Sequence, residues 1–458
     1  MSQNREQWGS KLGFILAASG SAVGIGNIWK YPHMAGQNGG AAFTLVYLAC
    51  IFVVGLSIVI AEFVIGRKTQ LSPVGAFEQL APSTNWKWVG FLGVASAFVI
   101  LSFYGVVGGW VLKYVIVSIT GGFNELAGDP AAAGNVFNTF ITDTWSPIIY
   151  QVFFMAFCVW VIVNGVKGGI EKWSKIMMPL IVVLLAVLAV RGMTLEGGMK
   201  GISFLFNPRF EDLTANSIVL ALGHSFFTVS LGMGTMITYG SYLNRKQNLL
   251  NAALWVIALD TAIAMLAGIA IFTTVFALGA NPAEGPGLIF VVLPSVFPQL
   301  AAGTLWGTIF FVLLFMAALT SAISILEVVT AYFIDQKGWS RKKATIQFGA
   351  VITVVGVFCS LSMGGGVNIT EFLGMTFFDV MDYLSAKYML PIGGMLTAIF
   401  ILRKWGISNY MAELKSGMGD TNISSRLVQV VLTIAAAVVA FIIFNEVYAE
   451  IFGKALIG

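Results

Sequence analysis

The stretch Gly20-Ser-Ala-Val-Gly-Ile-Gly26 interrupts an apolar segment near the N-terminus, and Ser230-Leu-Gly-Met-Gly234 interrupts another. Gly24 and Gly232 lie 208 residues apart. Small residues at spacing of four let membrane helices pack closely, which is one interpretation of either stretch alone. Packing does not explain why both stretches fall at matching places in two halves of the chain. We therefore predict that each one breaks a helix.

The composition indicates a membrane protein. Of 458 residues, 58% are hydrophobic and only 10% are charged, whereas soluble domains carry roughly 25% charged residues. A second apolar solvent, the lipid bilayer, explains the shortage of charge. The net charge of +4 reflects loop bias, so we expect no nucleic-acid partner.

Eleven apolar runs are long enough to span the membrane, because a bilayer core needs roughly 20 apolar residues per helix. The predicted spans cover residues 12–36, 41–66, 88–121, 146–164, 174–191, 216–240, 250–279, 302–335, 342–362, 371–403 and 426–448.

The basic residues predict the orientation of these spans. If the N-terminus is cytoplasmic, 18 of the 25 Lys and Arg residues fall on the cytoplasmic side, as the positive-inside rule requires. The C-terminus then lies outside. The short connectors between spans favour a bacterial inner-membrane protein.

The matching offsets predict an inverted repeat within one transporter domain, residues 1–458. The long third and eighth spans begin 214 residues apart, close to the offset between the two breaks. We assign the first repeat to 12–191, the second to 216–403, and leave 426–448 as an additional helix. Because each copy holds five spans, an odd number, the copies lie upside down relative to each other. Broken spans at corresponding positions point to a binding site at the membrane midplane.

Five motifs on the predicted spans resemble the neurotransmitter:sodium symporters, the LeuT group. The motifs are Arg5-Glu-Gln-Trp8, Gly20-Ser-Ala-Val-Gly-Ile-Gly-Asn-Ile-Trp29, Asn38-Gly-Gly40, Phe226-Phe-Thr-Val-Ser-Leu-Gly232 and Leu319-Thr-Ser321. They occur in the family's order over nearly the whole chain. The resemblance implies an all-α, LeuT-type 5+5 inverted repeat with spans one and six broken, plus one further helix.

The resemblance also implies two sodium sites built from oxygen ligands, which suit a hard cation. The first would use Ala22, Asn27, Thr228 and Asp260, together with the substrate's carboxylate. The second would use Gly20, Val23, Ala317, Thr320 and Ser321. Without the resemblance, ordinary hydrogen bonds to their own helix would explain Thr320 and Ser321.

Asp260 and His224 depart from the commonest family pattern. A carboxylate in mid-span costs about 2.5 to 3.5 kcal/mol on insertion scales, so we expect Asp260 to be paired, protonated or functional. Many family members have Asn there and bind chloride nearby; Asp260 would supply that negative charge, which predicts chloride-independent transport. His224, where LeuT-like proteins have Gln, is open to two interpretations: proton coupling with Asp260, or a buried, hydrogen-bonded histidine.

By the same resemblance, the substrate pocket would bind an amino acid. Its predicted residues are Ser21, Ala22, Gly24, Ile25, Gly26, Ile100, Tyr104, Phe227, Thr228, Ser230, Met233, Ser321 and Ile325. Tyr104 and backbone N–H groups at a helix start would bind the carboxylate. Gly24 replaces the Asp of monoamine transporters, which disfavours a monoamine. Flexible Met233 in an apolar subsite favours hydrophobic and aromatic side chains, although such residues are ordinary core residues in most proteins.

Two charge pairs are predicted gates. Lys30 with Asp382 would close the outer path, and Arg5 with Asp335 the inner one. Lys30 at an interface is alternatively a simple membrane anchor.

The sequence as a whole predicts a sodium-coupled amino acid symporter, a monomer or weak homo-oligomer, that carries two sodium ions. A sodium-independent exchanger of the same architecture is the closest alternative. The chain lacks the phosphate-binding loop of an ATP-driven pump, and its two histidines, on different spans, do not favour an enzyme.

Overall fold

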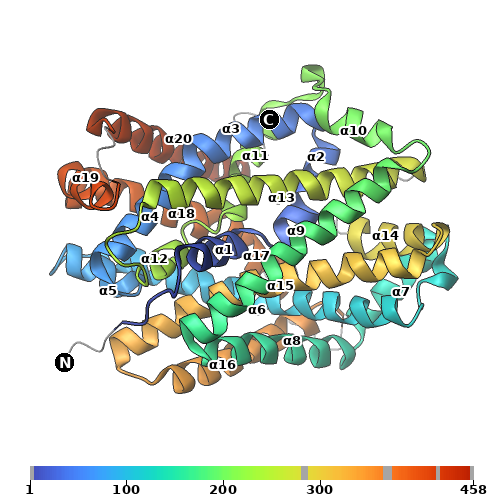
Figure 1. Ribbon diagram of the computed structural model, residues 1–458, viewed down its shortest axis with the longest axis horizontal. Helices are drawn as coiled ribbons and strands as arrows, with labels where there is room; N and C mark the ends of the chain where they lie inside the picture. The colour runs from blue at the N-terminus through green and yellow to red at the C-terminus, as the bar shows by residue number, and fades with distance from the viewer. Residues whose placement is uncertain (1–4, 280–286, 365–373, 419–422, 454–458) are drawn as a thin grey trace.

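The computed structural model describes residues 5–279, 287–364, 374–418 and 423–453. Within these ranges every regular element is helical, and the long helices run side by side across one bundle (Figure 1). The all-α class predicted from the sequence is therefore confirmed.

Nine continuous helical segments of the described chain are long and apolar enough to cross a membrane. Five of these segments bury half or more of the residues in their most apolar 18-residue stretch. They cover Ala41–Thr69 (α3, η2, α4), Lys87–Ile119 (α6), Ser146–Val163 (α8), Val166–Met193 (η4, α9), Leu249–Ala277 (α13), Gly303–Lys337 (α15), Arg341–Leu361 (α16), Phe377–Trp405 (α17, η8, α18, η9) and Ser425–Phe452 (α20).

The first predicted span is broken where the glycines indicate. Helix α1, Lys11–Ala22, starts at Ser10, whose side chain accepts a hydrogen bond from the Gly13 N–H. The chain becomes extended at Val23 (ψ 104°) and resumes as η1, Gly26–Lys30, and α2, Tyr31–Gln37. The two halves are bent by 52°.

The sixth predicted span, 216–240, is divided into α11, Ala215–Thr228, and α12, Thr235–Gly240. Between them Ser230, Gly232 and Gly234 have positive φ angles, which end a right-handed helix. A Cβ on Gly232 would lie 2.1 Å from the Leu390 carbonyl oxygen, so close packing as well as conformation requires glycine there. Each half is shorter than a membrane span, so the count of eleven spans stays a prediction.

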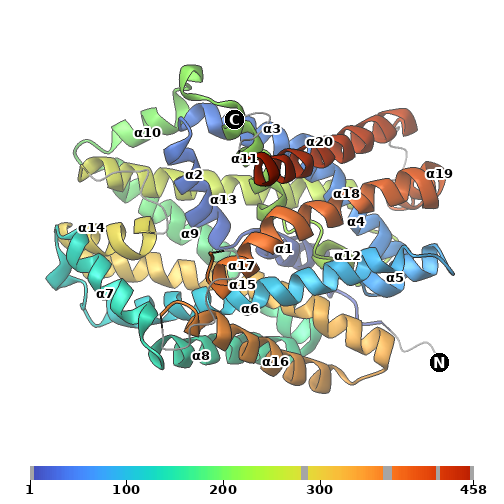
Figure 2. The same ribbon diagram turned by 180° about the vertical axis from the view of Figure 1, so that it is seen from behind.

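Helices α6 and α15 form the centre of the bundle, with 33 and 35 residues, and lie side by side in both views (Figures 1 and 2). They are the third and eighth predicted spans. The assignment of repeats to 12–191 and 216–403 remains a prediction.

The two ends of the bundle differ in what covers them. We name as the proximal end the one near the N-terminus, α5 (Pro73–Leu80) and α19 (Ile407–Lys415) (Figure 1). The opposite, distal end carries α7 (Pro130–Thr142), α10 (Met199–Phe206) and α14 (Leu293–Val296).

Candidate functional site

A small buried pocket lies where the two helix breaks meet. The Ser230 hydroxyl donates to the Ser21 carbonyl at 2.8 Å and so joins the two breaks. The pocket is lined by Ser21, Ala22, Gly24, Gly26, Ile100, Tyr104, Phe227, Thr228, Ser230, Met233, Ser321 and Ile325. Each of these residues was predicted from the sequence. The one other predicted residue, Ile25, lines the adjoining distal cavity instead.

The pocket presents polar backbone on one side and apolar side chains on the other. The Ile25 N–H donates to the Tyr104 hydroxyl at 3.3 Å, so both groups face the point where a carboxylate could accept from each. A Cβ on Gly24 would lie 2.6 Å from the Ser321 hydroxyl and 3.1 Å from the Tyr104 hydroxyl. Any side chain at position 24 would therefore intrude on the polar side.

The pocket is narrow in this conformation. It leaves about 20 Å³ for the centres of water-sized molecules, which is enough for roughly one water. An amino acid side chain therefore requires neighbouring groups to move, and Met233 is the flexible side chain on the apolar wall.

A first cluster of oxygen atoms borders the pocket. The Asn27 amide donates to one carboxylate oxygen of Asp260 at 2.7 Å, and the Thr228 hydroxyl donates to the same oxygen at 3.2 Å. The Asn27 carbonyl oxygen accepts from the Gly24 N–H at 3.1 Å. Asp260 is fully buried, and three helices, α11, α13 and η1, bring these groups together.

A second cluster joins the first break to α15. The Thr320 hydroxyl lies 3.3 Å from the Val23 carbonyl oxygen and 3.0 Å from that of Ala317. The Ser321 hydroxyl lies 3.4 Å from the Gly20 carbonyl oxygen and 3.2 Å from that of Val23. All five residues predicted for the second sodium site are thus within one network of neutral oxygens.

Buried acids and hydroxyls brace the breaks. Glu62 accepts from the Gly232 N–H at 2.8 Å, and Ser21 donates to the Ser324 hydroxyl at 2.7 Å. The Glu62 carboxylate thereby satisfies a backbone N–H that the interruption of the helix leaves without an intrahelical partner, and the serine pair joins the first break to α15.

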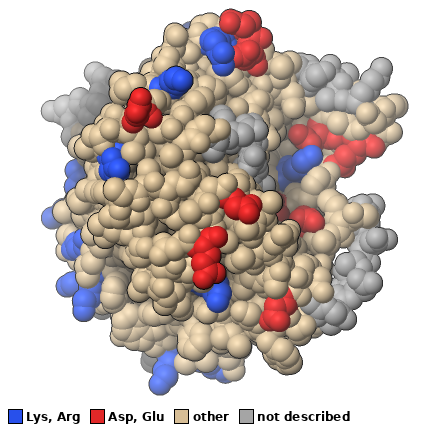
Figure 3. All heavy atoms as spheres, turned by 90° about the vertical axis from the view of Figure 1, so that its right-hand side faces the viewer, with Lys and Arg blue, Asp and Glu red and all other residues tan. Residues whose placement is uncertain are grey.

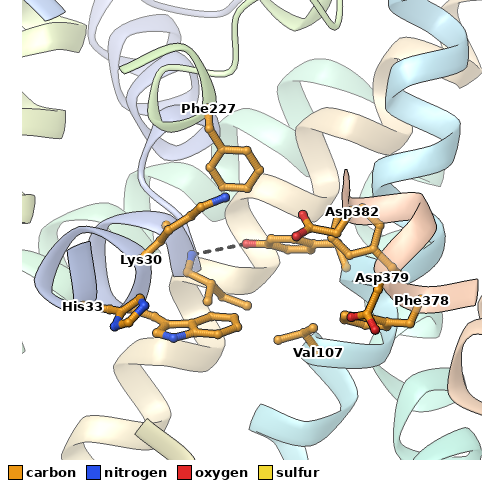
Figure 4. A pocket seen from close by; sticks show the side chains of 12 residues that line it. Lys30, His33, Val107, Phe227, Phe378, Asp379 and Asp382 are labelled. Carbon is orange, nitrogen blue, oxygen red and sulfur yellow. Dashed lines mark hydrogen bonds between the residues drawn. The ribbon is translucent and has the colours of Figure 1, made fainter. Parts of the chain in front are cut away.

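A wider cavity of about 270 Å³, drawn in Figure 4, adjoins the pocket on its distal side and shares Gly26, Tyr104 and Phe227 with it. Lys30 lies over the Phe227 ring, with 4.5 Å from its Nζ to the ring centroid, while Asp382 lies on the facing helix (Figure 4). Among the described residues no ion pair joins Lys30 to Asp382. Figure 3, viewed from this end, shows a hollow bordered by acidic and basic side chains. We refer to the 270 Å³ cavity lined by Lys30, Phe227 and Asp382 as the distal vestibule.

Ion pairs link the helices at the proximal end, beside a cavity of about 350 Å³ that Arg5, Ala331 and Asp335 help to line, which we call the proximal cavity. Arg5 forms an ion pair with Asp335 and donates to the Ser241 hydroxyl at 2.6 Å, and Asp335 also accepts from the Ser72 N–H at 2.6 Å. Arg341 adds a second link, since it pairs with Glu327 at 2.7 Å. The structure therefore brings together the predicted inner pair and leaves the predicted outer pair apart.

The sequence did not single out most of the vestibule wall. The additional lining residues are Trp29, His33, Phe103, Val107, Phe378 and Asp379. Asp379 had a detectable signal, because it precedes Asp382 by three residues and so shares its helix face. The apolar residues had none, since Trp and Phe are common in any membrane core.

His224 is buried against the rings of Tyr31 and Tyr47, whose centroids lie 6.5 and 5.3 Å from its own. Neither imidazole nitrogen has a hydrogen-bond partner among the described residues. The described residues therefore do not support the interpretation of His224 as a hydrogen-bonded histidine.

The fold and the oxygen-lined pocket together define a membrane transporter with a LeuT-type fold. The family model for the sodium:neurotransmitter symporter family matches residues 5–129 and 141–453. The chain belongs to this family, which is a family of transporters and not of enzymes, and it is a sodium-dependent, multi-pass membrane transporter.

Individual relatives agree with this assignment. The chain is 41% identical over 415 residues to the sodium-dependent transporter YhdH of Bacillus subtilis, covering 91% of both chains. It is 34% identical to a sodium-dependent transporter of Haemophilus influenzae, covering 87% of this chain and 89% of the relative. The crystal structure of MhsT in complex with L-phenylalanine matches with a TM-score of 0.88 and 46% identity, covering 96% of this chain and 99% of MhsT. The description of the Bacillus subtilis and Haemophilus influenzae relatives as sodium-dependent transporters disfavours the sodium-independent exchanger.

Proposed function

We propose that the protein imports hydrophobic or aromatic L-amino acids together with two sodium ions by alternating access. The observation that carries this proposal is the convergence of Asn27, Thr228 and Asp260 with the backbone of the first break at one pocket. There a sodium ion and a substrate carboxylate would be neighbours, so each would strengthen the binding of the other.

The substrate class follows from the two sides of the pocket. The Ile25 N–H and the Tyr104 hydroxyl would donate to the carboxylate in place of their mutual hydrogen bond. Ile100, Met233 and Ile325 offer only apolar contact to the side chain. Binding of L-phenylalanine by MhsT, which is similar along almost the whole chain, supports a large apolar substrate.

The two oxygen clusters support two sodium ions of different character. The cluster at Asp260 includes a buried carboxylate, whereas the cluster at Thr320 and Ser321 contains neutral oxygens only. The negative charge of Asp260 would balance the first ion without chloride. We therefore propose chloride-independent transport.

The two ends of the bundle support the alternating mechanism. With Arg5 and Asp335 paired and Lys30 apart from Asp382, the pocket communicates with the distal vestibule. We propose that the distal end faces the outside of a bacterial inner membrane, with the N-terminus cytoplasmic and the C-terminus outside. Each sodium ion then moves down a voltage that supplies about 2.3 kcal/mol per 100 mV, besides its concentration gradient.

The test is the thermal midpoint of the purified protein with each of the twenty amino acids in sodium chloride, sodium gluconate and potassium chloride. Stabilisation by Leu, Phe or Trp is expected in both sodium salts and not in potassium. Equal stabilisation in potassium would refute coupling to sodium. A requirement for chloride would refute only the role of Asp260.

A further inference from the structure

Lys387 is a charged residue within the apolar helical segment Phe377–Trp405. Its ammonium group forms an ion pair with Glu446 of α20 at 2.6 Å. A charge inside a membrane helix is costly unless it is paired or reaches water. Helix α20, Ser425–Phe452, lies along α18, Leu390–Phe400, as Figure 2 shows, and so supplies the partner.

A second acidic residue of α20 binds the same segment one helical turn further on. Glu450 accepts a hydrogen bond from the Tyr388 hydroxyl at 2.5 Å and another from Tyr383. The Lys387 Nζ also lies 4.7 Å from the centroid of the Tyr383 ring. We name these contacts the distal clasp: Tyr383, Lys387 and Tyr388 on one side, Glu446 and Glu450 on the other.

The clasp lies on the same short helical segment as the acids of the vestibule. Asp379 and Asp382 on α17, Phe377–Leu384, line the vestibule (Figure 4), and Tyr383 is the next residue. Consecutive helical residues point about 100° apart, so one stretch of helix presents acids to the vestibule and the clasp to α20. The clasp residues Lys387 and Tyr388 lie in η8, Ser385–Met389, a π-helical turn, which is a frequent feature of functional sites.

The clasp is formed while the vestibule is open. In this conformation Lys30 and Asp382 are not paired, whereas the proximal Arg5–Asp335 pair is formed. Closure over the pocket would require Asp382 to approach Lys30. The accompanying movement of α17 would stretch the contacts of the clasp with α20. Helix α20 contributes no residue to the pocket or to the vestibule lining given above.

We propose that α20 holds the distal half of the segment Phe377–Trp405 in its vestibule-open position through the clasp. Glu446 and Glu450 are then positioning residues that set how readily Asp382 moves toward Lys30. This inference rests on the proposed passage of the amino acid through the distal vestibule.

The test uses a cysteine at Val107, which lines the vestibule (Figure 4). In full-length Val107→Cys protein, a membrane-impermeant thiol reagent reports how often the vestibule is open. Sodium plus amino acid should slow labelling if the proposed function is right, because the vestibule closes. Adding Glu446→Gln should slow labelling in sodium alone about three- to fivefold, which is the upper part of the range measured for exposed ion pairs.

Charge exchange separates positioning from simple damage to the fold. The double variant Lys387→Glu/Glu446→Lys should label within about twofold of the parent, since the pair is reformed. Glu211→Gln on the exposed turn Phe210–Asp212 makes the same chemical change at the distal end and should have no effect. If Glu446→Gln does not fold, Glu450→Gln and Tyr388→Phe test the same clasp and should slow labelling in the same direction.

The two possible failures are distinguishable. Loss of amino-acid protection in the Val107→Cys parent would overturn the proposed function. Protection in the parent, together with unchanged or faster labelling in the clasp variants, would overturn the clasp. Slow labelling that charge exchange does not restore would also overturn it, because the effect would then not arise from the pair.

Discussion

Replacement of Asp260 by Asn tests the sodium site most directly. The carboxylate is fully buried and accepts from the Asn27 amide at 2.7 Å. Asn keeps one acceptor oxygen in a side chain of the same size, but it removes the negative charge and replaces the other oxygen by an NH2 donor. Two opposite unit charges about 4 Å apart attract by about 4 kcal/mol at an effective dielectric constant near 20.

Part of that attraction remains as the ion–dipole interaction of the amide. We therefore expect a net loss of about 2 to 3 kcal/mol, which is an apparent sodium affinity about 30- to 150-fold weaker. The assay is the sodium concentration that gives half-maximal thermal stabilisation with a fixed amino acid, measured in gluconate. Adding chloride should strengthen the apparent sodium affinity of the variant about tenfold, because an anion bound nearby would restore the missing negative charge.

The matched control is Asp379→Asn, the same substitution on the vestibule wall and outside the oxygen cluster. The sodium concentration that gives half-maximal stabilisation should stay within about twofold of the parent's value. A solvent-exposed charge outside the oxygen cluster is screened by water and salt and contributes little to sodium binding. If Asp260→Asn binds sodium as tightly as the parent in gluconate, the charge of Asp260 does not hold the ion and the argument for chloride independence fails.

Three further substitutions test the pocket and the proximal gate. Tyr104→Phe should weaken amino acid binding about five- to tenfold through loss of one hydrogen bond, with unchanged stabilisation by sodium alone; calorimetry measures both. Met233→Phe should reduce the affinity for Trp about tenfold relative to that for Leu, because a stiffer ring leaves less room for a large side chain in the apolar part of the pocket. An unchanged ratio of Trp to Leu affinity in a competition assay would contradict this. Arg5→Ala should increase thiol labelling of Ala331→Cys, which lines the proximal cavity, about threefold or more through loss of the Arg5–Asp335 pair, and an unchanged rate would argue against a gate.

The pocket was predictable to an unusual degree because its residues lie on recognisable motifs. Gly24 and Ser230 belong to the breaks themselves, and Tyr104, Met233 and Ser321 follow from the register that the resemblance supplies. The vestibule was not predictable in this way. Phe103, Val107 and Phe378 line it, but nothing in their identity separates them from other apolar residues of a membrane core.

The sequence by itself determined the membrane class, the positions of the helices and the two breaks, because hydrophobicity and glycine content act within one segment. The sequence also predicted the pair of Arg5 and Asp335, which the structure forms. Only the tertiary structure decided that Lys30 lies apart from Asp382 and that Lys387 meets Glu446. Such contacts depend on distances of a few ångströms between helices far apart in the chain, and helix packing fixes those distances, not local pattern.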